Sequence, residues 1–66
     1  MSRQRNELVG KFRFEVYFGP GDSVTSSPHG NRNACYARML DLRAAKGATG
    51  CELFYYVAGI GWTVAG

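Results

Sequence analysis

The side chains best suited to recognition are aromatic and arginine side chains that recur at the spacing of β-strands. Arg13 and Tyr17 lie four residues apart in one alternating stretch, and Phe54 and Tyr56 lie two residues apart in a second stretch. Because successive side chains of a strand point to opposite faces, each pair is expected to share a face. Tyrosine and arginine are enriched at interaction hot spots, and aromatic rings also stack on nucleic-acid bases. The pattern therefore indicates non-covalent binding.

Residue groups typical of catalysis or metal binding are missing from the sequence. His29 is the single histidine, and the neighbouring Ser26 and Ser27 have no marked activating partner. The sequence contains no phosphate-binding loop motif and no C-x-x-C pair, and its five acidic residues are scattered. We therefore expect no enzymatic activity, no cofactor and no metal ion.

Localisation signals are also missing from the sequence pattern. The first residues are polar, and the longest apolar stretch, residues 53–62, is far shorter than the ~20 residues of a membrane span. Cys35 and Cys51 are expected near opposite ends of a helix, too far apart for a disulfide, so both thiols are expected to be reduced. We therefore expect a cytoplasmic protein that does not bind membranes.

The positive charge is concentrated near the N-terminus. The net charge is +3, and it arises from Arg3, Arg5, Lys11 and Arg13 against Glu7. Two interpretations of residues 1–10 stay open: a flexible basic arm that contacts phosphate or an acidic partner, and a solvated terminus without a role. No linker or repeat divides the chain, so residues 1–66 are expected to form a single domain.

The first half of the chain predicts a strand and a long connection. In residues 11–18, Phe12, Phe14, Val16 and Phe18 alternate with Lys11, Arg13, Glu15 and Tyr17. Residues 19–22 predict a turn, and residues 23–26 are expected to be a short edge strand or a loop. The connection over residues 19–31 is long, which is typical of functional or mobile loops.

A helix is predicted from about Arg32 to Lys46, ended by Gly47. Its N-cap is expected at Asn31 or Asn33, with a start at Ser27–Pro28 as the weaker alternative. One apolar stripe contains Cys35, Met39 and Leu42, and a second contains Tyr36, Leu40 and Ala44. So wide an apolar sector is either entirely core or divided between the sheet and a partner.

Residues 51–58 predict a strand that is apolar on both faces, followed by a hairpin turn at 58–61 and a last strand at 62–65. The fold is therefore expected to be α+β, with one helix packed on a small antiparallel or mixed sheet of three to four strands. The expected core contains Phe12, Phe14, Val16, Phe18, Met39, Leu42, Leu53, Tyr55, Val57, Trp62 and Val64. The opposite face is expected to present Arg13, Glu15, Tyr17, Glu52, Phe54, Tyr56 and Thr63.

This opposite face is the predicted interaction surface. The expected partner-binding residues are Arg13, Tyr17, Arg38, Arg43, Phe54 and Tyr56. Four states of the aromatic side chains stay open: burial by another protein, including a second copy in a homodimer, cover by the N-terminal segment of the same chain, stacking on nucleic-acid bases, and simple exposure. A protein partner is favoured, because a small domain with an apolar outer face gains most from burying it.

The succession FRFEVYF, NACYARMLDLRAAKGATG and CELFYYVAGIGWTVAG resembles small bacteriophage accessory proteins, among them anti-CRISPR proteins. The resemblance is one of architecture and implies a phage-encoded, non-enzymatic inhibitor in the host cytoplasm. Such a protein would block a host nucleoprotein complex such as a CRISPR effector. The basic balance of the chain favours steric blocking over mimicry of DNA. The alternative is a small nucleic-acid-binding regulator that uses the basic N-terminal arm and the aromatic sheet face.

Overall fold

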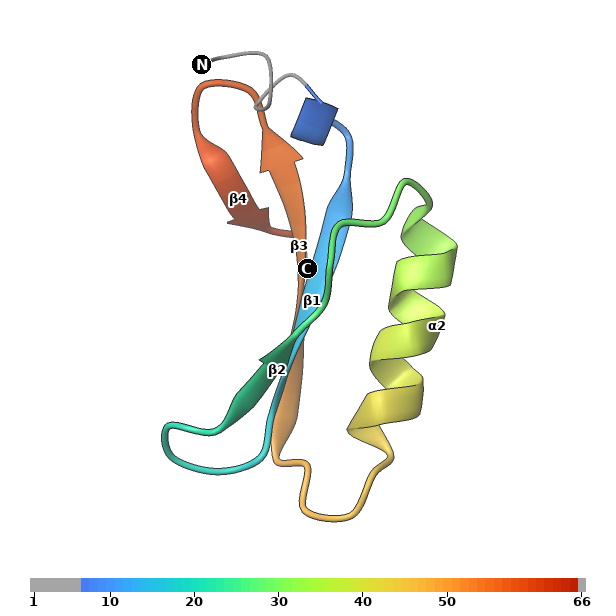
Figure 1. Ribbon diagram of the computed structural model, residues 1–66, viewed down its shortest axis with the longest axis vertical. Coiled ribbons are helices and arrows are strands. Elements are labelled where there is room, and N and C mark those ends of the chain that lie inside the picture. The colour runs from blue at the N-terminus through green and yellow to red at the C-terminus, as the bar shows by residue number, and fades with distance from the viewer. Residues whose placement is uncertain (1–6, 66) are drawn as a thin grey trace.

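The structure, a computed structural model, describes residues 7–65. A four-stranded sheet with the strand order β2-β1-β3-β4 carries the helix α2 on one face (Figure 1). All neighbouring strands are antiparallel. The elements are β1 (Phe12–Tyr17), β2 (Ser23–Thr25), α2 (Arg32–Arg43), β3 (Gly50–Val57) and β4 (Gly61–Val64). The predicted α+β fold class is confirmed, and the short strand β2 is present.

The core lies between α2 and the sheet face formed by the even-numbered residues of β1. Phe14 and Val16 of β1 are buried, and Leu53 of β3 lies opposite Phe14 in register. Cys35 and Met39 of α2 complete the buried cluster. The expected core therefore contained Phe14, Val16, Met39 and Leu53 correctly and left out Cys35.

Helix α2 begins at a capping asparagine. The Asn31 side chain accepts a hydrogen bond from the Ala34 N–H at 3.0 Å. This bond satisfies one of the N–H groups that lack an intrahelical partner in the first turn. Of the starts considered from the sequence, Asn31 is confirmed, and those at Ser27–Pro28 and Asn33 are wrong.

Replacing Asn31 with alanine is expected to lower the free energy of unfolding by about 1 kcal/mol, because the cap hydrogen bond is lost. Urea denaturation followed by circular dichroism measures the change. Asn33 lies inside the helix and is exposed, so Asn33→Ala is the matched control. Equal destabilisation by both variants would show that the cap at Asn31 contributes nothing specific.

The C-terminal end of α2 comes earlier than predicted. The helix ends at Arg43 rather than Lys46, and the chain turns through Gly47, whose φ of 94° suits glycine. The second apolar stripe stays outside the core: Tyr36 and Leu40 are both exposed. The apolar sector of α2 is therefore divided, with one stripe buried against the sheet and the other facing outward.

The long connection before α2 lies along the outer side of β1. His29 pairs with Phe12 through both backbone hydrogen bonds, at 2.8 and 2.7 Å. Ser26 donates its N–H to the Phe14 carbonyl oxygen, and its hydroxyl accepts from the Phe14 N–H. The His29 ring also stacks with Phe14 at 6.4 Å between ring centroids. These contacts give His29 a structural setting at the edge of the core.

The side chains of the last strand, β4, lie on the sheet faces opposite to those predicted. Trp62 and Val64 were expected in the core and Thr63 on the other face. In the observed register Trp62 lies opposite Tyr56, and Val64 lies opposite Phe54. Trp62 and Val64 therefore share the face that α2 does not cover, and Thr63 points to the helix side.

The length of the β3–β4 turn explains this error. Val57 pairs with Gly61, which leaves the odd-length loop Ala58–Ile60 between the strands. A loop shorter by one residue would shift the pairing and turn every side chain of β4 to the other face. Gly59 and Gly61 adopt φ values of 80° and 106°, a conformation that suits glycine, and thus fix this turn.

Candidate functional site

The sheet face opposite α2 gathers four of the chain's nine aromatic residues. We call it the open face. It contains Arg13, Glu15 and Tyr17 of β1, Glu52, Phe54 and Tyr56 of β3, and Trp62 and Val64 of β4. Seven of these residues are partly exposed, and Val64 is 51% exposed. Among β1, β2, α2, β3 and β4, none packs over this face.

Arg13 is the centre of the open face. Its guanidinium carbon lies 4.9 Å from the centroid of the Trp62 ring and 5.4 Å from that of Phe54. Tyr56 meets Trp62 edge to face, with ring centroids 5.2 Å apart. Three strands thus contribute to one cluster of aromatic rings around a cation. Each such contact at an exposed site stabilises the fold by about 0.5–1 kcal/mol.

The polar groups beside this cluster largely neutralise one another. A guanidinium nitrogen of Arg13 lies 3.6 Å from a carboxylate oxygen of Glu15. The Tyr17 hydroxyl donates a hydrogen bond to the other oxygen of Glu15 at 2.9 Å. Glu52 lies directly opposite Glu15 in the sheet. Lys11 directly precedes β1, and the alternation of the strand places it on the same side as Arg13 and Glu15. The open face and the adjoining Lys11 together carry two acidic and two basic side chains.

The hydrogen bond between Tyr17 and Glu15 predicts a pH response. Bonding to the Glu15 carboxylate raises the pKa of Tyr17 above its ordinary value of 10.0, aided by partial desolvation. Because the folded protein holds this proton more tightly than the unfolded chain, its stabilising effect is fully present below pH 10 and is lost above it. Absorbance titration of tyrosinate should show one late-titrating tyrosine in the native protein. Tyr17→Phe should remove that late component, and a titration unchanged by this variant would contradict the assignment.

The predicted site residues fall on two opposite sides of the molecule. Arg13, Tyr17, Phe54 and Tyr56 all lie on the open face, as expected. Arg38 and Arg43 lie on α2, which packs against the other face, and both are exposed. Figure 1 shows this separation of the helix from the far side of the sheet. The six residues therefore do not form one continuous patch.

Trp62 and Val64 are functional candidates that sequence reasoning assigned to the core. Their place on the open face follows from the odd loop length before β4. The signal available in the sequence was the pair of glycines at positions 59 and 61. A three-residue hairpin loop often needs a glycine at its left-handed position. The glycine spacing therefore favours a three-residue loop over a two-residue loop.

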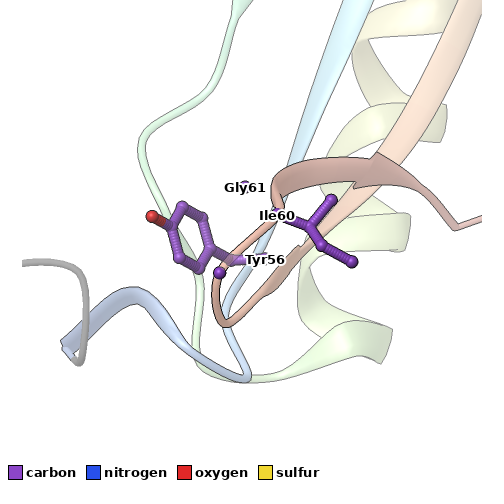
Figure 2. Close-up of a pocket in the computed structure, with 4 residues that line it drawn as sticks. Tyr56, Ile60 and Gly61 are labelled. Carbon is purple, nitrogen blue, oxygen red and sulfur yellow. The ribbon is translucent and has the colours of Figure 1, made fainter.

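A shallow hollow at the β3–β4 turn borders the open face. Tyr56, Gly59, Ile60 and Gly61 line it. Figure 2 shows the Tyr56 ring and the Ile60 side chain at this turn, extending in different directions. Ile60 is 77% exposed. The hollow contains no charged side chain, so it extends the apolar part of the open face toward the end of the sheet.

A second exposed apolar area lies on α2. Tyr36 and Leu40 are 44% and 45% exposed, and the Arg32 guanidinium carbon lies 6.0 Å from the Tyr36 ring centroid. This helical area has two large apolar or aromatic side chains, whereas the open face has five: Tyr17, Phe54, Tyr56, Trp62 and Val64. The open face is therefore the stronger candidate for a binding surface.

The described residues contain neither a group that could hold a metal ion nor a membrane-spanning helix. Across residues 7–65, no three histidine, cysteine, aspartate or glutamate side chains gather where they could hold a metal ion. In the same part of the chain, no helix is both long and apolar enough to cross a membrane.

Cys35 and Cys51 are free cysteines, and burial raises the pKa of the Cys35 thiol.

In comparisons with known proteins, no family model matches the chain, and neither a curated protein nor a solved structure matches it. The side chains gathered by the fold therefore carry the functional interpretation.

Proposed function

We propose that the protein is a non-enzymatic binding domain that attaches to another protein through its open face. The supporting observation is the cluster of Arg13, Phe54, Tyr56 and Trp62, which three strands bring together on the sheet face opposite α2. Aromatic and arginine side chains are the types that dominate binding energy at protein interfaces. Their burial by a partner would also complete the second face of a small sheet.

The charges of the open face favour a protein over a nucleic acid as the partner. Nucleic-acid binders use a positively charged surface that releases counterions from phosphates. Here Arg13 is already paired with Glu15 and stacked on aromatic rings, and Glu52 adds a further negative charge. A phosphate backbone would meet two carboxylates beside the rings, whereas the mixed polar edge suits a protein interface.

The partner expected from the architecture is a bacterial nucleoprotein complex such as a CRISPR effector. In this proposal the protein is a phage-encoded inhibitor that acts in the host cytoplasm by covering part of that complex. Trp62 and Tyr56 would be the anchors, with Val64 and Phe54 beside them. The competing proposal is a nucleic-acid-binding regulator with a basic N-terminal arm. Residues 1–6 of that arm lie outside the described residues, and Gly10 donates its N–H to the Tyr56 carbonyl oxygen at 3.5 Å.

A pull-down from bacterial lysate with and without nuclease tests the proposal. The tagged wild-type chain is expected to recover one stoichiometric protein complex in both samples, as read by mass spectrometry. Tyr56→Ala should reduce this recovery by about tenfold or more, because it removes a central aromatic side chain from the open face. Circular dichroism confirms that the variant is folded.

Arg38→Ala is the matched control for this experiment, because Arg38 is exposed on the helix at the other side of the sheet. It is expected to leave recovery unchanged. Loss of the complex in Arg38→Ala with full recovery in Tyr56→Ala would assign binding to α2 instead. Recovery of nuclease-sensitive material alone would favour the nucleic-acid regulator.

A further inference from the structure

Strand β4 lies at one end of the strand order and has a single described neighbour, β3. Ala65 donates its N–H to the Leu53 carbonyl oxygen at 2.8 Å, which fixes the phase of the β3–β4 ladder. In an antiparallel ladder, alternate residues direct their backbone groups toward the same neighbour. The backbone groups of Thr63 therefore face β3, and those of Trp62 and Val64 face away from the sheet.

The other side of the sheet does not offer such an edge. β2 has three residues, and the chain continues from it along β1 until His29 pairs with Phe12. Pro28 interrupts the run of N–H groups on this side. The outer edge of β1 is thus covered along its length, and within residues 7–65 β4 is the better-formed unpaired edge.

The sequence of β4 and its turn lacks the charged residues and the proline that commonly prevent edge pairing. Residues 58–65 include no charged residue and no proline. Natural proteins commonly protect exposed edge strands with lysine, proline or a bulge. Because this segment is neutral, two chains that each carry a net charge of +3 can approach here with little local repulsion.

We propose that two copies of the chain pair through their β4 strands, antiparallel and with Thr63 at the two-fold axis. In this register Trp62 of each copy lies opposite Val64 of the other, so a large side chain meets a smaller one. The outward backbone groups of Trp62 and Val64 pair with their counterparts. The two Thr63 side chains meet across the axis, a favourable cross-strand pair.

The geometry of Trp62 leaves room for this pairing. Its ring contacts Tyr56 of β3 and Arg13 of β1, so it leans toward the interior of its own sheet and away from the free edge. A two-fold axis perpendicular to the sheet keeps like faces on the same side. The paired sheets would therefore present one continuous open face with two copies of the aromatic cluster. A neutral, self-complementary edge fits a second copy better than a charged segment of another protein.

Sedimentation velocity over a range of concentrations tests this proposal. A range from about 10 μM to about 1 mM is suitable, since a short strand edge forms a small and weak interface. The wild-type chain is expected to shift from monomer to dimer with rising concentration. Thr63→Lys should remain monomeric, because two like charges would face each other at the axis. Thr25→Lys, on the opposite edge strand β2, is the matched control and should dimerise like the wild type.

A synthetic chain with an N-methyl group on the Val64 amide provides a second test that keeps all side chains. This amide faces outward, so its methylation leaves the β3–β4 ladder intact and blocks the edge. The methylated chain is expected to be folded and monomeric. A wild-type chain that stays monomeric at every concentration would overturn the proposal, and so would dimerisation that persists in both Thr63→Lys and the methylated chain.

Discussion

Replacing Leu53 with alanine is expected to lower the free energy of unfolding by about 2–5 kcal/mol, the largest stability effect we predict for a single strand residue. Leu53 is 6% exposed and packs with Phe14 of β1 and Met39 of α2. The deletion leaves a cavity at the point where the helix meets the two central strands. A chain of 66 residues has a total stability of only about 3–10 kcal/mol. Leu53→Ala should therefore leave much of the protein unfolded or close to unfolding at 25 °C.

Urea denaturation followed by far-ultraviolet circular dichroism measures this loss. Tyr55→Ala is the matched control, because Tyr55 points to the same side of β3 but is 38% exposed. Its loss should cost clearly less, although the sequence pattern also assigned Tyr55 to the core. Helix α2 packs mainly against β1, which leaves this part of β3 uncovered. Equal destabilisation by the two variants would contradict the observed limits of the core.

Replacing Trp62 with alanine is expected to separate folding from binding. The variant loses the contacts of the ring with Arg13 and Tyr56, which together stabilise the fold by about 1–2 kcal/mol. It should remain folded. Binding of the protein partner should weaken by about 30-fold or more, the effect of losing a hot-spot side chain worth about 2 kcal/mol.

This variant also distinguishes the two registers of β4. If Trp62 were a core residue, as the sequence pattern suggested, its replacement would cost about 3–5 kcal/mol and unfold the chain. Urea denaturation and the pull-down, carried out on the same preparation, give both quantities. An unfolded Trp62→Ala would refute the open-face position of Trp62, and a folded variant with unchanged binding would remove Trp62 from the proposed interface.

The parts of the fold that the sequence predicted are those with strong local patterns. The alternation from Phe12 to Phe18 determines which face of β1 is buried, because each residue has its own fixed side of the strand. The expected core likewise included Met39 of the buried stripe of α2, although it left out Cys35, which is fully buried. Neither inference depended on knowing which elements pair, since each follows from the geometry of a single element.

The predictions that were wrong are those that depend on how two elements pair or pack. The face of Trp62 is decided by the odd loop Ala58–Ile60, and a change of one residue in loop length reverses it. Apolar content could not reveal the error, because β4 is apolar at both Trp62 and Val64 whichever face they occupy. The placement of Arg38 opposite Arg13 likewise required knowing which face of the sheet the helix covers. The register of the β3–β4 hairpin decided the first, and the packing of the helix on the sheet decided the second.

The measurement that tests the open face most directly is a cross-saturation NMR experiment on the isotope-labelled chain bound to the captured partner. Saturation of the partner's protons weakens the signals of those residues that contact it. We expect the losses to concentrate on Arg13, Phe54, Tyr56, Trp62 and Val64 of the open face. Losses concentrated on Tyr36 and Leu40 of α2, with the signals of the open face unchanged, would contradict the account.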